Sequence, residues 1–120
     1  MLAKKERRKF VRFRPKDGTM AVNHHALGPV MNISMGGLSF RYMGEDETKP
    51  VSDLLGIFLG SDDVLIEKIP TKVISDKLVS QGSTFMKTST RQRSIEFTKL
   101  TQSQRSSLKE FIGSKTMGTY

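Results

Sequence analysis

Two short groups of residues in the N-terminal third of the chain carry side chains suited to binding a phosphorylated base. Arg8 and Arg12 stand four positions apart in a strongly basic stretch, and Arg7 directly precedes them. Arginine presents a planar fork of donors that can hold a phosphate through two hydrogen bonds, bond O6 and N7 of guanine, or stack on a purine. On its own this spacing is also typical of a solvated run of charge, so the interpretation depends on the second group.

The second group is the hexapeptide 32–37, which reads Asn-Ile-Ser-Met-Gly-Gly. Asn32 and Ser34 are two positions apart, so on a strand their side chains share one face. Their amide and hydroxyl groups can both donate and accept hydrogen bonds, which suits the polar edge of guanine. Gly36 and Gly37 then permit a tight turn and a close approach of the backbone to a ligand. Alternatively, Asn32 and Ser34 only close the turn through local hydrogen bonds to the backbone.

The positive charge of the chain is concentrated at its N-terminus. The 120 residues carry a net charge of +8. Residues 1–16 hold eight basic side chains and one acidic side chain, whereas the rest of the chain holds 12 basic and 11 acidic ones. A basic arm on a nearly neutral body attracts anions such as phosphate, nucleic acid or acidic lipid, and charge alone does not choose among them.

The composition argues against several classes of protein. There is no cysteine, and the only histidines are the adjacent His24 and His25, which would point to opposite faces of a strand, so we expect no metal site. No nucleophile–base–acid set is recognisable, so we expect neither an enzyme nor a cofactor. No apolar run approaches the roughly 20 residues that span a bilayer, and the basic start lacks the apolar core of a secretory signal. We therefore expect a cytoplasmic protein without membrane insertion.

Short alternating segments separated by turn residues indicate a mostly β protein. Strands are predicted at 19–25, 30–34, 38–42, 55–59, 64–68, 71–79 and 83–90, with Ile95 and Phe97 closing the β region. We interpret Gly28-Pro29 as the turn that folds the second strand back along the first and so brings the two motifs together. Six or seven strands of this kind favour an antiparallel β-barrel with a C-terminal α-helix over one opening.

The helix is predicted at about residues 102–112. Thr101 and Gln104 have the spacing of a capping box, and Leu108, Phe111 and Ile112 form one apolar stripe. Gly113 is the expected C-cap. The chain then divides into a basic arm at 1–16, a barrel with its helix at 17–113, and a flexible tail at 114–120.

In their order and spacing the two motifs resemble the signature of PilZ domains, which are bacterial receptors for cyclic di-GMP. The first has the form R-x-x-x-R and the second N-x-S-x-x-G, a variant that the family uses beside the Asp form. The resemblance extends over about residues 6–113 and includes the stretch 94–101 with the helix that follows. Residues 44–90 match the family only in their pattern.

The resemblance implies a role for each motif residue. The arginines would hold phosphate and guanine, Asn32 and Ser34 would bond a guanine, and the glycines would shape the turn. Arg7 is the type of residue that lets some members hold a stacked pair of ligands. The implied cyclic di-GMP site consists of Arg7, Arg8, Arg12, Asn32, Ser34, Gly36 and Gly37. Arg91 and Arg93 either flank the same site or lie on a solvated strand face.

The function that the resemblance implies is that of a non-enzymatic receptor, monomeric or homodimeric. Its arm would change conformation on binding cyclic di-GMP and signal to a protein partner that the sequence does not identify. One alternative is a PilZ-type adaptor that binds proteins but no nucleotide. Another is a basic β-barrel for RNA or single-stranded DNA. Such barrels expose aromatic side chains for base stacking, whereas this chain has no Trp and two Tyr, so we expect no nucleic-acid partner.

Overall fold

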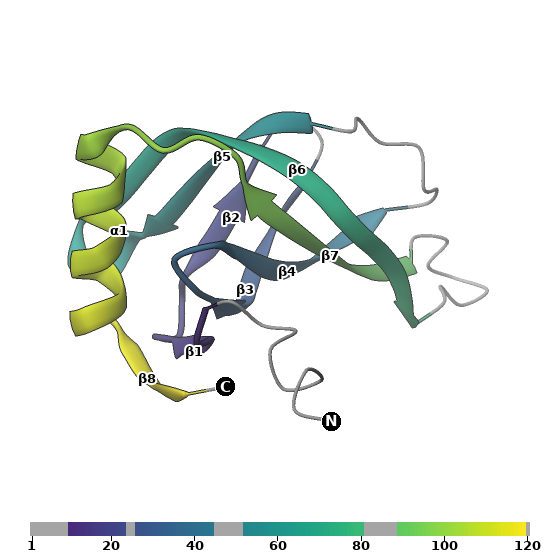
Figure 1. Ribbon diagram of the computed structural model, residues 1–120. Helices are drawn as coiled ribbons and strands as arrows, with labels where there is room; N and C mark the ends of the chain where they lie inside the picture. Colours follow the sequence, from purple (N-terminus) through teal and green to yellow (C-terminus); the bar gives the residue numbers. More distant parts are fainter. Residues whose placement is uncertain (1–9, 24–25, 45–51, 81–88, 120) are drawn as a thin grey trace, which may run out of the picture.

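The structure, a computed structural model, describes residues 10–23, 26–44, 52–80 and 89–119. These residues form eight strands, one short 3₁₀ turn and one α-helix (Figure 1). The elements are β1 (Phe13–Pro15), β2 (Met20–Val22), β3 (Leu27–Ile33), β4 (Gly37–Gly44), β5 (Ser52–Leu59), η2 (Gly60–Asp62), β6 (Val64–Ser80), β7 (Ser89–Phe97), α1 (Gln102–Ser114) and β8 (Thr116–Thr119).

Six antiparallel strands close into a barrel. Their order is β2-β5-β6-β7-β4-β3, and pairing of β2 with β3 completes the circle. Alternate side chains of each strand point inward, so residues such as Phe40, Ile57 and Ile69 are fully buried in one apolar core. The predicted β-barrel with a C-terminal helix is therefore confirmed. Strands β1 and β8 lie outside the closed circle, where β1 pairs with β3 and β8 pairs with β1.

Helix α1 lies across one end of the barrel (Figure 1). It starts at the predicted capping box, because Thr101 Oγ1 accepts from the Gln104 backbone N–H while the Gln104 side chain accepts from the Thr101 N–H, both at 3.0 Å. Leu108 and Phe111 are buried against the strands. The predicted C-cap at Gly113 is wrong, since helical bonding continues to Lys115, whose N–H donates to Phe111 O. No helix in the described ranges is long and apolar enough to cross a membrane.

Gly28 and Pro29 lie inside β3, so the predicted turn at this dipeptide is wrong. The turn falls earlier, where the Asn23 N–H donates to Ala26 O and the Ala26 N–H donates to Asn23 Oδ1. Gly28 is needed for packing rather than for turning, because a Cβ there would sit 1.5 Å from the Arg41 carbonyl oxygen on β4. The two strands nevertheless pair antiparallel as expected.

Strand β6 joins the two strands predicted at 64–68 and 71–79. It accommodates Pro70 beside a bulge, where Leu55 pairs with Ile69 but Ile57 pairs with Ile66, and Lys68 takes a left-handed φ of 56°. A proline in a strand was expected to mark such an irregularity. The predicted turn at Gln81-Gly82 and the beginning of the following strand lie outside the described residues.

Part of the predicted arm and part of the predicted tail form strands in the structure. Phe13–Pro15 of the arm form β1, and Thr116–Thr119 of the tail form β8 beside it. The Lys16 N–H also donates to Lys115 O at 2.8 Å. Sequence reasoning missed this pairing because neither segment is apolar enough to show a strand pattern, and each satisfies its backbone through the other.

A candidate ligand site under the N-terminal arm

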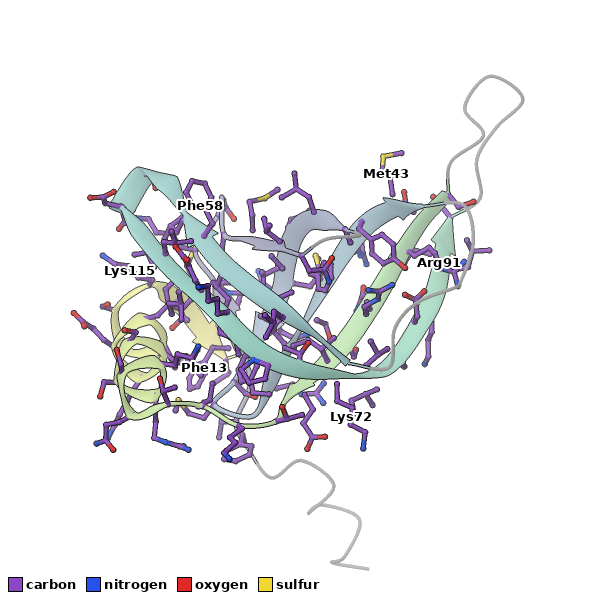
Figure 2. The ribbon with its side chains drawn as sticks, turned by 90° about the horizontal axis from the view of Figure 1, so that it is seen from above. Phe13, Met43, Phe58, Lys72, Arg91 and Lys115 are labelled. Atoms are coloured by element: carbon purple, nitrogen blue, oxygen red, sulfur yellow. The ribbon has the colours of Figure 1, made fainter. Side chains whose placement is uncertain are left out.

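A pocket of about 300 Å³ lies on the outer side of the barrel wall, between the arm and strands β3, β4, β6 and β7. The core side chains of these strands point inward, so the alternate residues form this outer surface. Figure 2 shows the outward direction on β6, where Lys72 projects away from the barrel. The residues that line the pocket are Phe10, Arg12, Asn32, Ser34, Gly36, Gly37, Leu38, Ser39, Ile74, Ser94, Ile95 and Glu96.

Five of the seven residues that sequence analysis assigned to a site line this one pocket. They are Arg12, Asn32, Ser34, Gly36 and Gly37. The two motifs are thus brought together although 20 positions separate Arg12 from Asn32. The other two, Arg7 and Arg8, lie outside the described residues.

Ser34 closes the β3–β4 turn. Its Oγ accepts from the backbone N–H groups of Gly36 and Gly37 at 3.1 and 3.2 Å and lies 3.3 Å from Gly37 O, to which it donates. These bonds use the one donor and the two acceptor positions of a hydroxyl. Ser34 therefore has the local role that the sequence left open, which is to close the turn through hydrogen bonds to the backbone. It shapes the pocket by holding this turn in place.

Asn32 retains hydrogen-bonding capacity. The residue is only 4% exposed, yet no hydrogen bond within the described part of the chain involves its side-chain amide. A buried polar group usually has a partner, because leaving it unpaired costs about 1–3 kcal/mol. The Asn32 amide, which lines the pocket, can offer a donor and an acceptor to a bound molecule.

A row of small polar residues crosses the pocket floor. Asn32 on β3 pairs with Ser39 on β4, which in turn pairs with Ser94 on β7. The Ser39 and Ser94 hydroxyls are 2.7 Å apart and hydrogen-bonded. Sequence analysis missed both serines, because their place in the floor follows from the cross-strand register. Because these two side chains are small, they leave space for the pocket between larger neighbouring side chains.

Gly37 allows the pocket to form at the turn. A Cβ on this residue would sit 2.1 Å from the Ile95 carbonyl oxygen on β7, so no larger residue fits without moving a strand. The turn is further joined to β7 by the Phe97 N–H, which donates to Gly36 O at 2.9 Å. On its open side the ring of Phe10 lies against Gly36. The arm is therefore in contact with the motif turn.

The pocket carries one positive and one negative side chain among its described lining residues. Arg12, on the arm, is half-buried. Glu96, on β7, is exposed and lies opposite Gly37. The rest of the described lining is neutral, so Arg12 is the side chain in this lining that can attract an anion.

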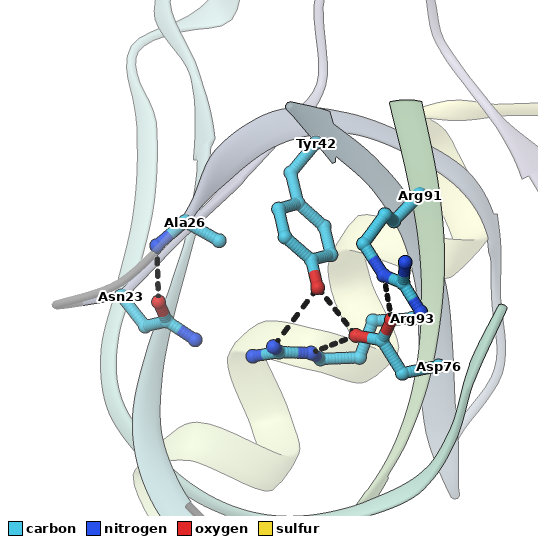
Figure 3. A network of polar contacts seen from close by, with 6 residues as sticks. All are labelled: Asn23, Ala26, Tyr42, Asp76, Arg91 and Arg93. Carbon is cyan, nitrogen blue, oxygen red and sulfur yellow. Dashed lines mark hydrogen bonds and ion pairs between the residues drawn. The ribbon is translucent and has the colours of Figure 1, made fainter. Parts of the chain in front are cut away.

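Arg91 and Arg93 belong to a separate cluster inside the barrel (Figure 3). Both side chains reach Asp76, Arg91 Nε at 2.6 Å and Arg93 Nε at 2.9 Å, and Tyr42 Oη donates to the same carboxylate. The Arg93 guanidinium lies over the Tyr42 ring, 4.8 Å from its centroid. Arg93 is 3% exposed, so the expected solvated strand face is wrong for it, and neither arginine lines the pocket. Their two-residue spacing before the buried Ile95 is the signal that could have placed them inside.

The cluster holds Asp76 in its charged form. Burial raises the pKa of the Asp76 carboxyl, but hydrogen bonds from Tyr42, Arg91 and Arg93 outweigh it and lower that pKa below 3.8. Burial and the hydrogen bond to Asp76 raise the pKa of Tyr42.

A second carboxyl with a shifted pKa is Asp62, which ends η2. Hydrogen bonds from Lys115 and Lys16 lower the pKa of Asp62. No group of three metal-ligating side chains occurs in the part of the chain that the structure describes.

Solved structures show that this barrel has the PilZ-like fold expected from the motifs. The PilZ domain of YcgR from Escherichia coli, solved with c-di-GMP, is similar with a TM-score of 0.65 at 14% identity, and the match covers 92% of each chain. The K. pneumonia MrkH–c-di-GMP complex is similar with a TM-score of 0.64 at 18% identity, and the match covers 88% of this chain but 50% of MrkH. No protein-family profile and no curated protein matches the sequence.

Proposed function

We propose that this protein is a non-enzymatic receptor for cyclic di-GMP. The observation that carries the proposal is the meeting of Arg12 with Asn32 and the 34–37 turn in one pocket. The two similar structures were both solved with c-di-GMP, which supports the same ligand for this chain.

The pocket chemistry suits a guanine nucleotide. The Arg12 guanidinium would hold a phosphate or the O6 and N7 edge of guanine. Asn32 would bond the base with the amide that has no partner among the described residues, while Ser34 would hold the turn in place. The volume of about 300 Å³ is at the lower limit for small-molecule sites, so it would enclose one base with its phosphate and leave the rest of the ligand near the arm.

The proposal includes Arg7 and Arg8, which precede the described residues. They would complete the anion site from the arm, and Arg7 would allow a second, stacked ligand. Ordering of the arm over the pocket would change the surface around Phe10 and transmit the signal to a protein partner. Because Phe13–Pro15 already form a strand, such a change would be confined to the residues before Phe13. We also propose a cytoplasmic location for this receptor.

Calorimetry tests this function directly. The protein is titrated with cyclic di-GMP, GTP and a short single-stranded oligonucleotide, and we expect saturable binding of cyclic di-GMP with a stoichiometry of one or two. Arg12→Ala should weaken that binding, whereas Arg105→Ala, an exposed arginine on α1, should not change it. Binding of the oligonucleotide alone would favour the nucleic-acid alternative. No binding of any of the three would favour the adaptor alternative.

A further inference from the structure

Glu96 is a wall residue of the pocket that neither motif contains. It is exposed and stands on the outer face of β7, two positions after Ser94 of the pocket floor. Gly37 on β4 and Lys72 on β6 are its cross-strand neighbours. No ion pair or hydrogen bond of its side chain occurs among the described residues, although Lys72 is adjacent. The carboxylate therefore retains its acceptor capacity.

A carboxylate is unexpected in the lining of a pocket that is proposed to bind a doubly negative ligand. A carboxylate about 10 Å from each of the two phosphate charges would be repelled by ~0.8 kcal/mol in total in water, and by more near the protein surface. Glutamate is also an acceptor only, so it cannot bond a phosphate oxygen. It becomes favourable only if the ligand presents hydrogen-bond donors to it.

We infer that Glu96 selects guanine by accepting hydrogen bonds from the N1–H and N2–H₂ groups of the base, a role that rests on the proposed function. These two donors stand side by side on one edge of guanine, and the two oxygens of a carboxylate match them with two parallel bonds. Arg12 and Asn32 would then serve the phosphate and the remaining polar atoms of the same ligand. Attraction by these bonds would outweigh the repulsion between carboxylate and phosphate.

The same residue would reject adenine. On the corresponding edge adenine offers one donor, its amino group, and one acceptor, N1, which would face a carboxylate oxygen. A site built around polar contacts discriminates strongly against an analogue that leaves them unpaired. Glutamine has the opposite pattern of one donor and one acceptor, which is complementary to adenine.

Glu96→Gln therefore tests the inference, with binding of cyclic di-GMP and cyclic di-AMP measured by calorimetry for each protein. Gln has nearly the same shape, and Glu96 is exposed, so folding is checked simply by thermal melting. We expect binding of cyclic di-GMP to weaken about 10- to 100-fold and binding of cyclic di-AMP to strengthen. Glu67→Gln is the matched control, because it makes the same change of charge at an exposed position outside the pocket.

Whether Glu96→Gln binds cyclic di-GMP more weakly or more tightly distinguishes a hydrogen-bond acceptor for guanine from a charge that only repels the ligand. If Glu96 only repels the ligand, Glu96→Gln should bind cyclic di-GMP about two- to fourfold more tightly. Unchanged or tighter binding would overturn the inference and leave the receptor function intact. A wild-type protein that fails to bind cyclic di-GMP would overturn the proposed function, and this inference with it.

Discussion

Replacing Asp76 by Asn should remove the charge that balances two arginines inside the barrel. The Asp76 side chain is 0% exposed, and it is held by Arg91, Arg93 and Tyr42. Asn has nearly the same volume, so no cavity forms and the loss is one of charge. Arg93, whose side chain is 4% exposed, would keep its contact with Tyr42 but lose its counter-ion.

The expected loss in the free energy of unfolding is about 3 kcal/mol. Breaking a buried ion pair by removing one partner costs about 3–5 kcal/mol, because the other charge stays buried without compensation. The lower value applies here, since the Arg91 side chain is 13% exposed and water would solvate part of it. Against a total stability of about 5–15 kcal/mol this loss is large but leaves the fold measurable.

Urea unfolding at neutral pH measures this loss, with Asp63→Asn as the control. Asp63 is exposed and has a left-handed φ of 58°, which Asn tolerates well. The double variant Asp76→Asn/Arg93→Gln should recover part of the loss, because it removes the unpaired charge. A loss for Asp76→Asn no larger than for Asp63→Asn would refute the view that this cluster stabilises the barrel.

The pH dependence of the same measurement has a definite sign. The folded-state pKa of Asp76 lies below its ordinary value of 3.8. The stability that the carboxylate contributes is therefore complete above that pH and is lost as the pH falls through the folded-state pKa. The difference between wild type and Asp76→Asn should shrink in the same direction. A difference that grows in acid would contradict the assigned ion pairs.

Three further predictions concern the ligand and the helix. Arg12→Ala and Arg8→Ala should each weaken binding of cyclic di-GMP by about 1.5–3 kcal/mol in calorimetry, with little change in melting of the free protein, and a loss of stability at unchanged affinity would contradict this. Phe111→Ala should lower the free energy of unfolding by about 3–5 kcal/mol, because Phe111 is 2% exposed, and a neutral result in urea would mean that α1 contributes little to the core. Amide exchange in residues 7–12 should slow when cyclic di-GMP binds, and equal protection in both states would exclude an arm that orders on binding.

The features that sequence analysis predicted correctly depend on short-range patterns. The helix start follows from Thr101 and Gln104 alone, because a capping box needs only these two residues and their backbone. The motif turn at 34–37 is likewise fixed by Ser34 and the glycines after it. The alternation of apolar and polar residues was sufficient to predict the strands of the barrel, since each strand needs one apolar face.

The features that it missed depend on which strands become neighbours. Gly28 is read as a turn residue until β4 is known to pass within contact distance of it. The partner of Arg93 is Asp76 on β6, and only the register of β6 with β7 brings the two together. Glu96 and Ser94 enter the pocket for the same reason. Pairings across distant segments carry no local signal, so these residues looked like ordinary strand positions.

The pairing of β1 with β8 has a consequence for how the protein folds. Phe13 and Thr119 lie near opposite ends of the chain, so bringing them together closes the longest loop of any strand pairing among the described residues. The six barrel strands can pair without it, which makes this contact a late step and one that opens at low cost afterwards. Arg12 directly precedes this strand. The arm that would meet a ligand is thus attached to a strand that pairs early with β3 but gains its second neighbour, β8, late.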